Sequence, residues 1–158
     1  PRHGGLTVSD SITGADDLGR VSKALKDIGD GELRKRTLAG IRKQGKPTIA
    51  DIRANALGSL PAGGGFAAIV AKTPIGVRTR LSPTTAGVTI RVTGKGDREG
   101  LDRRGRLRKP LFGNRGFWYT QNVRPGWFSE PAEENAPEFR RGIEQVLTDI
   151  KQEIERRV

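Results

Sequence analysis

The sequence of 158 residues contains no cysteine, and its only histidine is His3. Disulfides and thiolate zinc sites are therefore excluded, so packing or assembly with other chains must hold the fold together. One histidine supplies neither a metal-binding pair nor a base for a serine nucleophile. No apolar run approaches the roughly 18 residues of a membrane helix, and no charged-then-apolar signal segment opens the chain. We expect a soluble protein made in the cytoplasm, without redox chemistry and without contact with a membrane.

Acidic residues do not form a convincing catalytic pair. Asp16 with Asp17, and Asp97 with Asp102, are better explained as a helix start and as loop acids beside arginines. The largest cluster lies in the first turns of a predicted helix, where the helix dipole favours acids for stability alone, and comprises Glu130, Glu133, Glu134 and Glu138. Because no nucleophile, base and orienting group can be assembled, we predict no enzyme activity, no metal site and no cofactor.

What the chain does contain is positive charge. The formal net charge is +11, with 34% hydrophobic residues, 22 glycines and 9 prolines. This composition predicts one domain with a small core and long loops or arms. Excess lysine and arginine attracts polyanions, either nucleic acid or an acidic protein face, and a merely well-solvated basic surface is the alternative.

The N-terminal half is predicted to be helical after an arm. Residues 1–15 are small, polar and without periodicity, which predicts a flexible arm before a single domain of residues 16–158. Apolar residues at helical spacing predict a first helix that Gly29 to Gly31 interrupts: Leu18, Val21, Leu25 and Ile28. A second helix runs from Leu33 to about Gly58 and is kinked or split at Pro47.

Two features follow this helix. Pro61–Phe66 is predicted to be a flexible hinge, and it is not a phosphate loop because no lysine with serine or threonine follows its glycines. Next, Ile75–Leu81 and Gly87–Gly94 alternate apolar and polar residues, which predicts an antiparallel hairpin with one buried face. The other face is wet and basic, and it carries Arg78, Arg80 and Arg91.

Lys95–Lys109 is predicted to be a long basic loop, because it has too few apolar residues for a core element. Its charge density suits contacts with phosphates or with an acidic protein partner, although a solvated loop is equally consistent with it. The residues proposed for this contact are Arg98, Arg103, Arg104, Arg106, Arg108 and Lys109.

Nearly all the aromatic residues lie in one stretch, Leu111–Pro131, and only Phe66 and Phe139 lie outside it. Gly116–Val123 is predicted to be a third strand with rings on both faces, of which one packs on the core helices. The face with Trp118 stays exposed, as at an interface.

The rings suggest three roles. Trp118 and Tyr119 on the strand, with Trp127 and Phe128 in the following turn, are candidate anchors for a neighbouring subunit. For Trp127 and Phe128 the alternative is a hydrophobic staple that pins the last helix to the sheet. Aromatics beside basic residues also describe a platform for single-stranded nucleic acid.

The C-terminal segment is predicted to be an amphipathic helix that ends near Arg157. It begins with Ser129 as a cap, and Pro137 marks a kink or a restart capped by Asn135. Its apolar positions recur at three and four: Phe139, Ile143, Val146, Leu147, Ile150 and Ile154. The predicted fold is α+β, with N-terminal helices and this long helix packed on a small, mainly antiparallel sheet.

Two segments of the sequence resemble the tail-completion family of long-tailed bacteriophages, in its actinobacterial-phage form. They are "LRKPLFGNRGFW" at Leu107–Trp118 and "PGWFSEP" at Pro125–Pro131. The second resembles the family's proline-rich, aromatic entry to its last helix, and the similarity in element order spans about Leu18 to Val158.

The resemblance implies a structural virion protein at the head-to-tail junction, assembled in the host cytoplasm. It implies a ring of identical subunits, usually six, that acts as a tail terminator or as a joining protein. The implied partners are the major tail tube protein, a head-side connector or stopper protein, and the genomic double-stranded DNA in the channel. It implies no catalysis and no cofactor.

Overall fold

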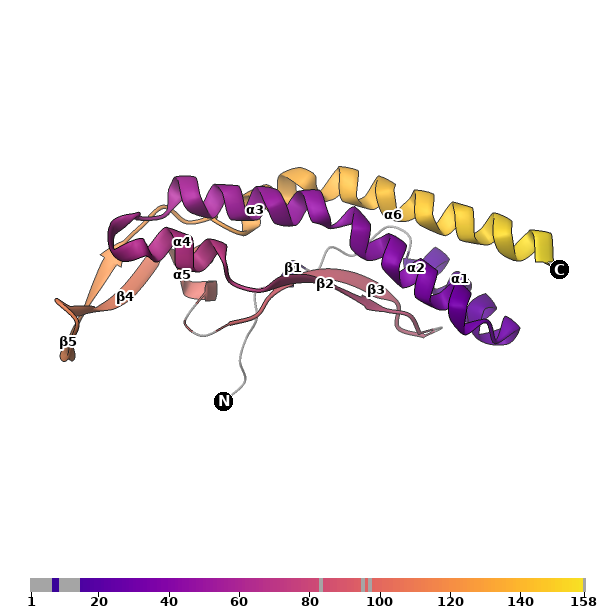
Figure 1. Cartoon of the computed structure of the whole chain (residues 1–158), viewed down its shortest axis with the longest axis horizontal. Coiled ribbons are helices and arrows are strands. Elements are labelled where there is room, and N and C mark those ends of the chain that lie inside the picture. Colours follow the sequence, from indigo (N-terminus) through magenta and orange to yellow (C-terminus); the bar gives the residue numbers. More distant parts are fainter. Residues whose placement is uncertain (1–6, 9–14, 83, 95, 97, 158) are drawn as a thin grey trace.

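The computed structural model describes residues 7–8, 15–82, 84–94, 96 and 98–157. His3, Asp97 and most of the arm predicted for residues 1–15 lie outside the described residues. The fold is α+β, as predicted from the sequence. Figure 1 shows an elongated molecule in which the C-terminal helix runs beside the N-terminal helices, while the strands form two separate sheets.

The first helices follow the predicted pattern closely. Helix α1 (Ala15–Ile28) is followed by α2 (Gly31–Gln44), and α3 spans Lys46–Ser59. The predicted split at Pro47 is thus confirmed, with Gly45 alone between α2 and α3. A Cβ on Gly45 would lie 2.3 Å from Cγ2 of Val77, so only glycine allows this close approach of helix and sheet.

The segment predicted as a hinge is instead part of a compact helical connection. Gly63–Gly65 forms the 3₁₀ turn η1, and α4 (Phe66–Ala71) follows at once and buries Ala67 and Val70. Gly64 and Gly65 have φ of 64° and 72°, which explains the glycines without any need for flexibility. Six helical residues are too few to show a helical period, so the sequence did not reveal α4.

The predicted hairpin is confirmed. Strands β2 (Ile75–Arg80) and β3 (Gly87–Val92) pair antiparallel, with Ile75 opposite Val92. The short strand β1 (Thr7–Val8) pairs with the other edge of β3, giving the order β1-β3-β2. Val88, Ile90 and Val92 are buried on one face of this sheet, as the alternation predicted.

The prediction of a loop at Lys95–Lys109 is wrong for most of its length. Helix α5 (Arg98–Arg104) and strand β4 (Arg106–Leu111) occupy it. Helix α5 packs through one apolar side chain, Leu101, which is too weak a signal for pattern analysis. Strand β4 pairs antiparallel with β5 (Asn114–Asn122) in a sheet of their own.

Strand β5 itself is confirmed, but its predicted packing is not. Its rings do not pack on the core helices: Phe117, Trp118 and Tyr119 are all exposed. The reason is that β5 belongs to the two-stranded sheet rather than to the sheet of β2 and β3. In Figure 1 the β4–β5 hairpin projects from one end of the molecule.

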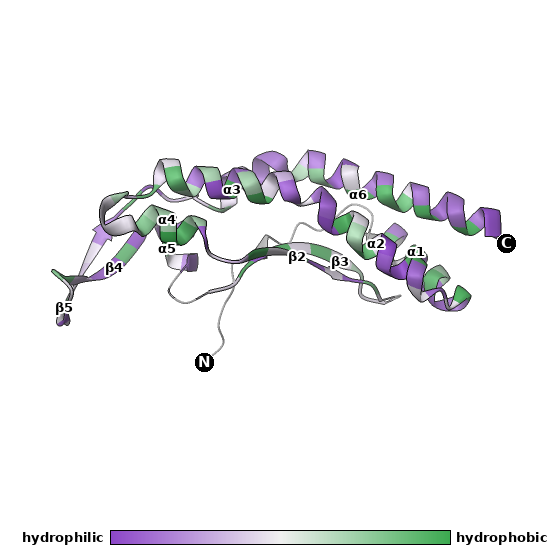
Figure 2. Cartoon of the chain, in the orientation of Figure 1, coloured by the Kyte–Doolittle hydropathy of each residue, from purple (hydrophilic) through white to green (hydrophobic). Residues whose placement is uncertain are grey.

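Helix α6 (Ser129–Arg157) continues through Pro137, which excludes the predicted restart. Pro137 lies inside the helix on its exposed side, where water can bond to the carbonyl that lacks an amide partner. Asn135 does not cap a second helix, because its Nδ2 donates to Oδ2 of Asp51 at 3.0 Å and to the Pro131 carbonyl at 2.8 Å. Hydrophobic and hydrophilic residues alternate along α6 in Figure 2, as an amphipathic helix requires.

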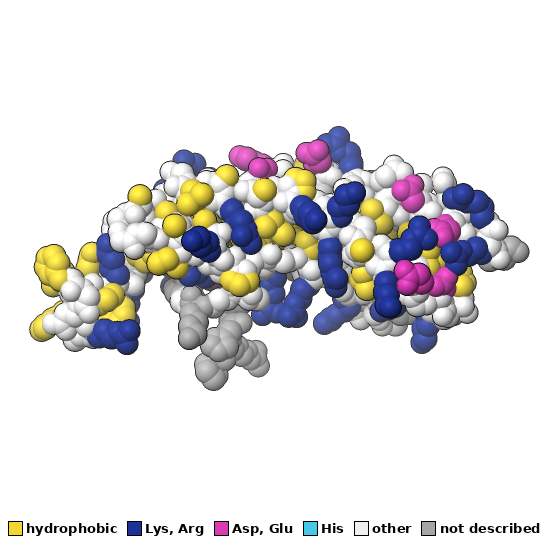
Figure 3. All heavy atoms as spheres, in the orientation of Figure 1, with side chains coloured by type: hydrophobic (Ala, Val, Ile, Leu, Met, Phe, Trp, Pro, Cys, Tyr) yellow, Lys and Arg dark blue, Asp and Glu magenta, His cyan; other side chains and the backbone are white. Residues whose placement is uncertain are grey.

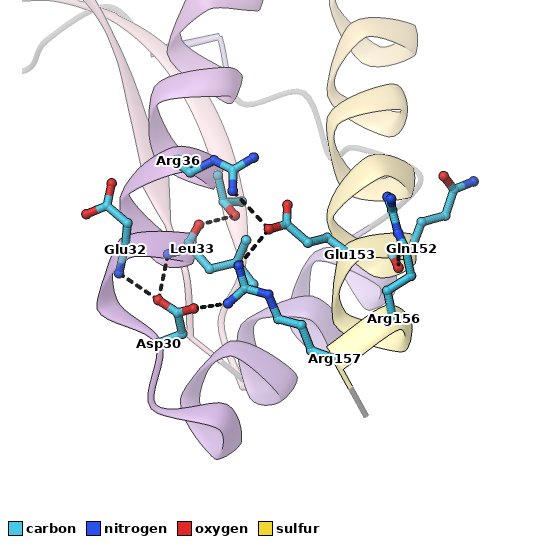
Figure 4. Close-up of polar contacts among 9 residues, drawn as sticks. Asp30, Glu32, Leu33, Arg36, Gln152, Glu153, Arg156 and Arg157 are labelled. Carbon is cyan, nitrogen blue, oxygen red and sulfur yellow. Dashed lines mark hydrogen bonds and ion pairs between the residues drawn. The ribbon is translucent and has the colours of Figure 1, made fainter.

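A polar network fixes the end of α6 to the start of α2 (Figure 4). Asp30 caps α2 by accepting from the backbone amides of Glu32 and Leu33, both at 3.0 Å, and it also pairs with Arg157. Glu153 accepts from Arg157 at 2.7 Å and from Arg36 at 2.9 Å. Two helices far apart in sequence are thereby joined through shared carboxylates.

Candidate interaction surfaces

The β4–β5 hairpin exposes most of the aromatic surface of the chain. At its tip, Phe112 and Gly113 form a two-residue turn, and both have positive φ, 49° and 77°. Phe112 is 98% exposed, so a large apolar ring in a disfavoured backbone conformation stands fully in solvent. Such strain at an exposed position is typical of functional sites.

Each face of the hairpin combines a ring with a cation. Arg108 lies over Trp118, with 5.4 Å from Cζ to the ring centroid, and Lys109 lies over Tyr119, with 5.3 Å from Nζ to the centroid. Lys109 is directly opposite Tyr119 in the register. Trp118 Nε1 also donates to the Arg115 carbonyl at 2.8 Å. The rings of Trp118 and Tyr119 are therefore oriented by cation–π contacts, and that of Trp118 also by a hydrogen bond.

The structure separates the six basic residues predicted to act together in a loop. Arg98, Arg103 and Arg104 belong to α5, whereas Arg106, Arg108 and Lys109 belong to β4. Arg106 and Arg108 share one face of the hairpin, and Lys109 lies on the other, because successive strand residues alternate.

Within α5, Arg98 and Arg103 have specific environments. Partial burial lowers the pKa of the Arg98 guanidinium from its ordinary value. Arg103 forms an exposed ion pair with Glu99 at 3.1 Å. A contact with phosphates on this helix would therefore rely mainly on Arg103 and Arg104, both of which are exposed.

The three arginines predicted for the outer face of the first sheet do lie on that sheet. Arg78 and Arg80 are exposed on β2, and Arg91 on β3 is half-buried. Arg78 and Arg80 line an open hollow of about 440 Å³ together with Thr85, Gly87 and Thr89. The hollow has the positive charge and hydroxyl groups to bind an anion.

Trp127 and Phe128 are not surface residues, which corrects their assignment as interface anchors. Both are fully buried in the core of this chain, with their rings 5.7 Å apart at 63°. The alternative of a hydrophobic staple agrees better with the structure, because Trp127 and Phe128 pin the start of α6 against α3. Asn55 on α3 donates from Nδ2 to the Trp127 carbonyl at 3.0 Å.

Asp102 fixes the turn that buries these rings. Its Oδ1 accepts from the backbone amides of Phe128, at 2.7 Å, and Ser129, at 3.0 Å. The cap of α6 thus comes from α5 rather than from the predicted Ser129. Only the tertiary fold brings Asp102 to this position, so local sequence analysis missed its role as a cap.

A third surface lies over α3, α4 and the start of α6. Residues 54–71 contain no charged side chain, and Leu57 and Ile69 within them are 56% and 59% exposed. Figure 3 shows hydrophobic side chains gathered over this part of the molecule and over the hairpin. Beside Ala54, a groove of about 190 Å³ between α3 and α6 is lined by Asp51, Glu130 and Glu134.

In the described part of the chain, no three histidine, cysteine or acidic residues lie close enough together to hold a metal ion. None of the described helices has the length and hydropathy of a membrane span.

Comparison of the chain with protein-family models, with curated proteins and with solved structures found no match.

Proposed function

We propose that this protein is a subunit of a homo-oligomeric ring at the head-to-tail junction of a long-tailed bacteriophage, where it terminates the tail tube or joins the tail to the head. The observation that supports it most is the projecting β4–β5 hairpin, whose rings are exposed on both faces. An aromatic surface of this kind usually marks a protein interface. The two segments that resemble the phage family, Leu107–Trp118 and Pro125–Pro131, supply this hairpin and the entry to α6.

A ring built from one kind of subunit requires two unlike surfaces, because each copy contacts its two neighbours through different patches. The hairpin is one candidate patch, and the uncharged surface of residues 54–71 is another. The basic face of Arg78, Arg80 and Arg91 remains available for DNA in the channel or for an acidic face of an adjoining ring. The proposed partners are the tail tube protein and a head-side connector.

Sedimentation of the purified chain, alone and with tail tubes, combined with electron microscopy, tests this function. The proposal predicts closed rings, either free or seated at the end of the tubes. A chain that stays monomeric in both conditions and leaves tube ends bare would contradict it.

A second candidate is a nucleic-acid-binding module without sequence preference. The observation that favours it is the pairing of cations with exposed rings on the hairpin, since rings stack on bases while guanidiniums contact the backbone. Its affinity for a short oligonucleotide should fall steeply between about 50 and 200 mM salt. Replacement of Arg103, Arg104, Arg106 and Arg108 by serine should abolish binding, and weak binding by the wild type even at low salt would exclude this function.

A further inference from the structure

We propose that the β4–β5 hairpin of one copy docks on the next copy, on the uncharged surface of residues 54–71 and the adjoining groove between α3 and α6. Its aromatic tip lies near Leu57, and its cations face the acidic groove of Asp51, Glu130 and Glu134. This inference rests on the proposed ring and specifies its subunit contact. It follows from four features: a hairpin that packs little against the described part of its chain, an exposed uncharged surface, opposite charge at the two places, and rings that are oriented before docking.

Within the described residues, the hairpin makes few contacts with the rest of its own chain. Beyond the pairing of β4 with β5, its main packing is against α5 at its base. Strands of this length extend about 20 Å at 3.3 Å per residue, which carries the tip away from the body. Phe112, Phe117 and Trp118 are 98%, 66% and 48% exposed. Since each aromatic side chain can bury about 150 to 250 Å², the arm offers several hundred Å² of ring surface to a partner.

The proposed receptor places apolar and acidic groups side by side. Leu57, which is 56% exposed, lies one helical turn beyond Ala54 on α3, and Ala54 lines the groove. The groove is open, and its lining includes Ala54, Asn55 and Pro131 besides the carboxylates. A ring can thus rest against Leu57 and Ala54 while a basic side chain reaches the carboxylates.

Charge favours this pairing over contact between two hairpins. Residues 103–129 contain no aspartate or glutamate, and Arg106, Arg108, Lys109 and Arg115 all lie within the hairpin. Two hairpins would therefore repel each other. The first turns of α6 carry Glu130, Glu133 and Glu134, and Asp51 lines the same groove from α3. Glu130 already pairs with Arg124 of its own chain at 3.1 Å, so the charge offered to a neighbour comes mainly from Asp51 and Glu134. Opposite potentials at the two patches select a head-to-tail contact, which is the type that generates a ring.

The arm is also organised before it docks. The contacts of Arg108 with Trp118 and of Lys109 with Tyr119, and the bond from Trp118 Nε1 to the Arg115 carbonyl, orient these two rings in the single chain. Docking therefore costs less ordering entropy than binding by a disordered loop would.

The absence of cysteine makes a direct test possible, because each introduced thiol is unique. Asn114 adjoins the hairpin tip and Gly58 adjoins Leu57, so cysteines there leave the proposed apolar contacts in place, and a side chain at Gly58 enters open space. We expect a mixture of Asn114→Cys and Gly58→Cys to form a covalent heterodimer with a short bis-maleimide reagent, while neither variant alone does so. A chain with both substitutions should give a series of cross-linked oligomers that ends at the closed ring. The matched control is Ile28→Cys on α1, an exposed apolar position far along the chain, mixed with Asn114→Cys. We expect at least tenfold less cross-linking in this control.

Charge exchange provides an independent measurement. Arg115→Glu in the Asn114→Cys chain, or Glu134→Arg in the Gly58→Cys chain, should each reduce the yield of heterodimer about tenfold. Combination of the two charge variants should restore most of it. Failure of the combination to restore the yield would contradict the charge contact.

The outcomes separate this inference from the function on which it rests. Equal cross-linking in the test and control mixtures, efficient cross-linking of Asn114→Cys with itself, or no cross-linking at all would overturn the docking. If the wild-type protein nevertheless sediments as a ring, the proposed function stands with a different subunit contact. A wild-type protein that never forms rings, alone or with tail tubes, would overturn both.

Discussion

The guanidinium of Arg108 on β4 lies over the indole of Trp118 on β5, with 5.4 Å between Cζ and the ring centroid. The two residues are diagonal neighbours across the hairpin, since Arg108 pairs with Thr120 in the register. The cation covers part of the ring and fixes it, while the ring remains 48% exposed. A large aromatic surface is therefore displayed in a set orientation on an arm that packs little against the body.

Trp118→Ala should leave a folded chain but prevent its assembly. The ring is exposed, so its removal changes the core little, whereas truncation of an interface anchor commonly costs about 2 kcal/mol or more of binding free energy. We expect an unchanged circular dichroism spectrum and at least a 30-fold loss in ring formation or in binding to tail tubes. Ile28→Ala, an exposed apolar change on α1, is the control and should assemble normally. Normal assembly of Trp118→Ala would remove Trp118 from the interface.

Trp127→Ala should have the opposite effect, although the two tryptophans are close in sequence. Trp127 is fully buried against Phe128. Its removal leaves a cavity at the junction of α3, α5 and α6, and such changes cost about 3 to 5 kcal/mol. Urea denaturation should show this loss in the free energy of unfolding. A stability near that of the wild type would mean that Trp127 is not in the core.

Asp102→Ala should destabilise the start of α6. The substitution leaves the amides of Phe128 and Ser129 without the acceptor that now binds both. An unsatisfied buried amide costs about 1 to 3 kcal/mol. Glu99→Ala in the same helix is the matched control, because it removes only an exposed ion pair with Arg103, worth about 0 to 1 kcal/mol. Equal losses in free energy of unfolding for the two variants would exclude Asp102 as the cap.

The network between α2 and α6 should make stability depend on pH. Hydrogen bonding by Arg36 lowers the pKa of Glu153 below its ordinary value of 4.5, and the Leu33 amide lowers that of Asp30 below 3.8. Because both pKa values are depressed in the folded state, the network stabilises the fold at pH above the ordinary values. This contribution is lost as the pH falls through the depressed values.

Thermal unfolding of Glu153→Gln at several pH values tests the direction of this pH dependence. The variant should unfold at a lower temperature than the wild type at pH 7, and the difference in unfolding temperature should shrink as the pH is lowered through the acid range. Thr148→Ala, an exposed change on the same helix, should show no such trend. A difference between Glu153→Gln and the wild type that grows at acid pH would contradict the assignment.

The sequence predicted the elements with a strong period and missed those without one. Helices α1, α2, α3 and α6, and the β2–β3 hairpin, each repeat their apolar residues over several turns or pleats. Helices α4 and α5 were missed because each has only six or seven residues, and β4 because it is rich in charged residues and hardly buried.

The candidate surfaces were predicted only in part. The exposure of Trp118 could be predicted because rings lie on both faces of one strand. The burial of Trp127 could not be predicted from the sequence, because it depends on α5 and on Asp102, which is distant in the chain. The acidic groove also combines Asp51 with Glu130 and Glu134 from another helix, so the sequence predicted only helix-stabilising acids there. Side chains that meet through tertiary contacts leave no local pattern in a single sequence.

The measurement that tests the proposed function most directly is electron microscopy of lysates from a phage in which the gene for this chain has been deleted, with heads, free tails and tail lengths counted. We predict filled heads beside unattached tails. Over-long or irregular tails would assign the role of terminator, and tails of normal length that fail to attach would assign the role of joining protein. Intact, infectious particles in normal number would contradict a place for this protein at the head-to-tail junction.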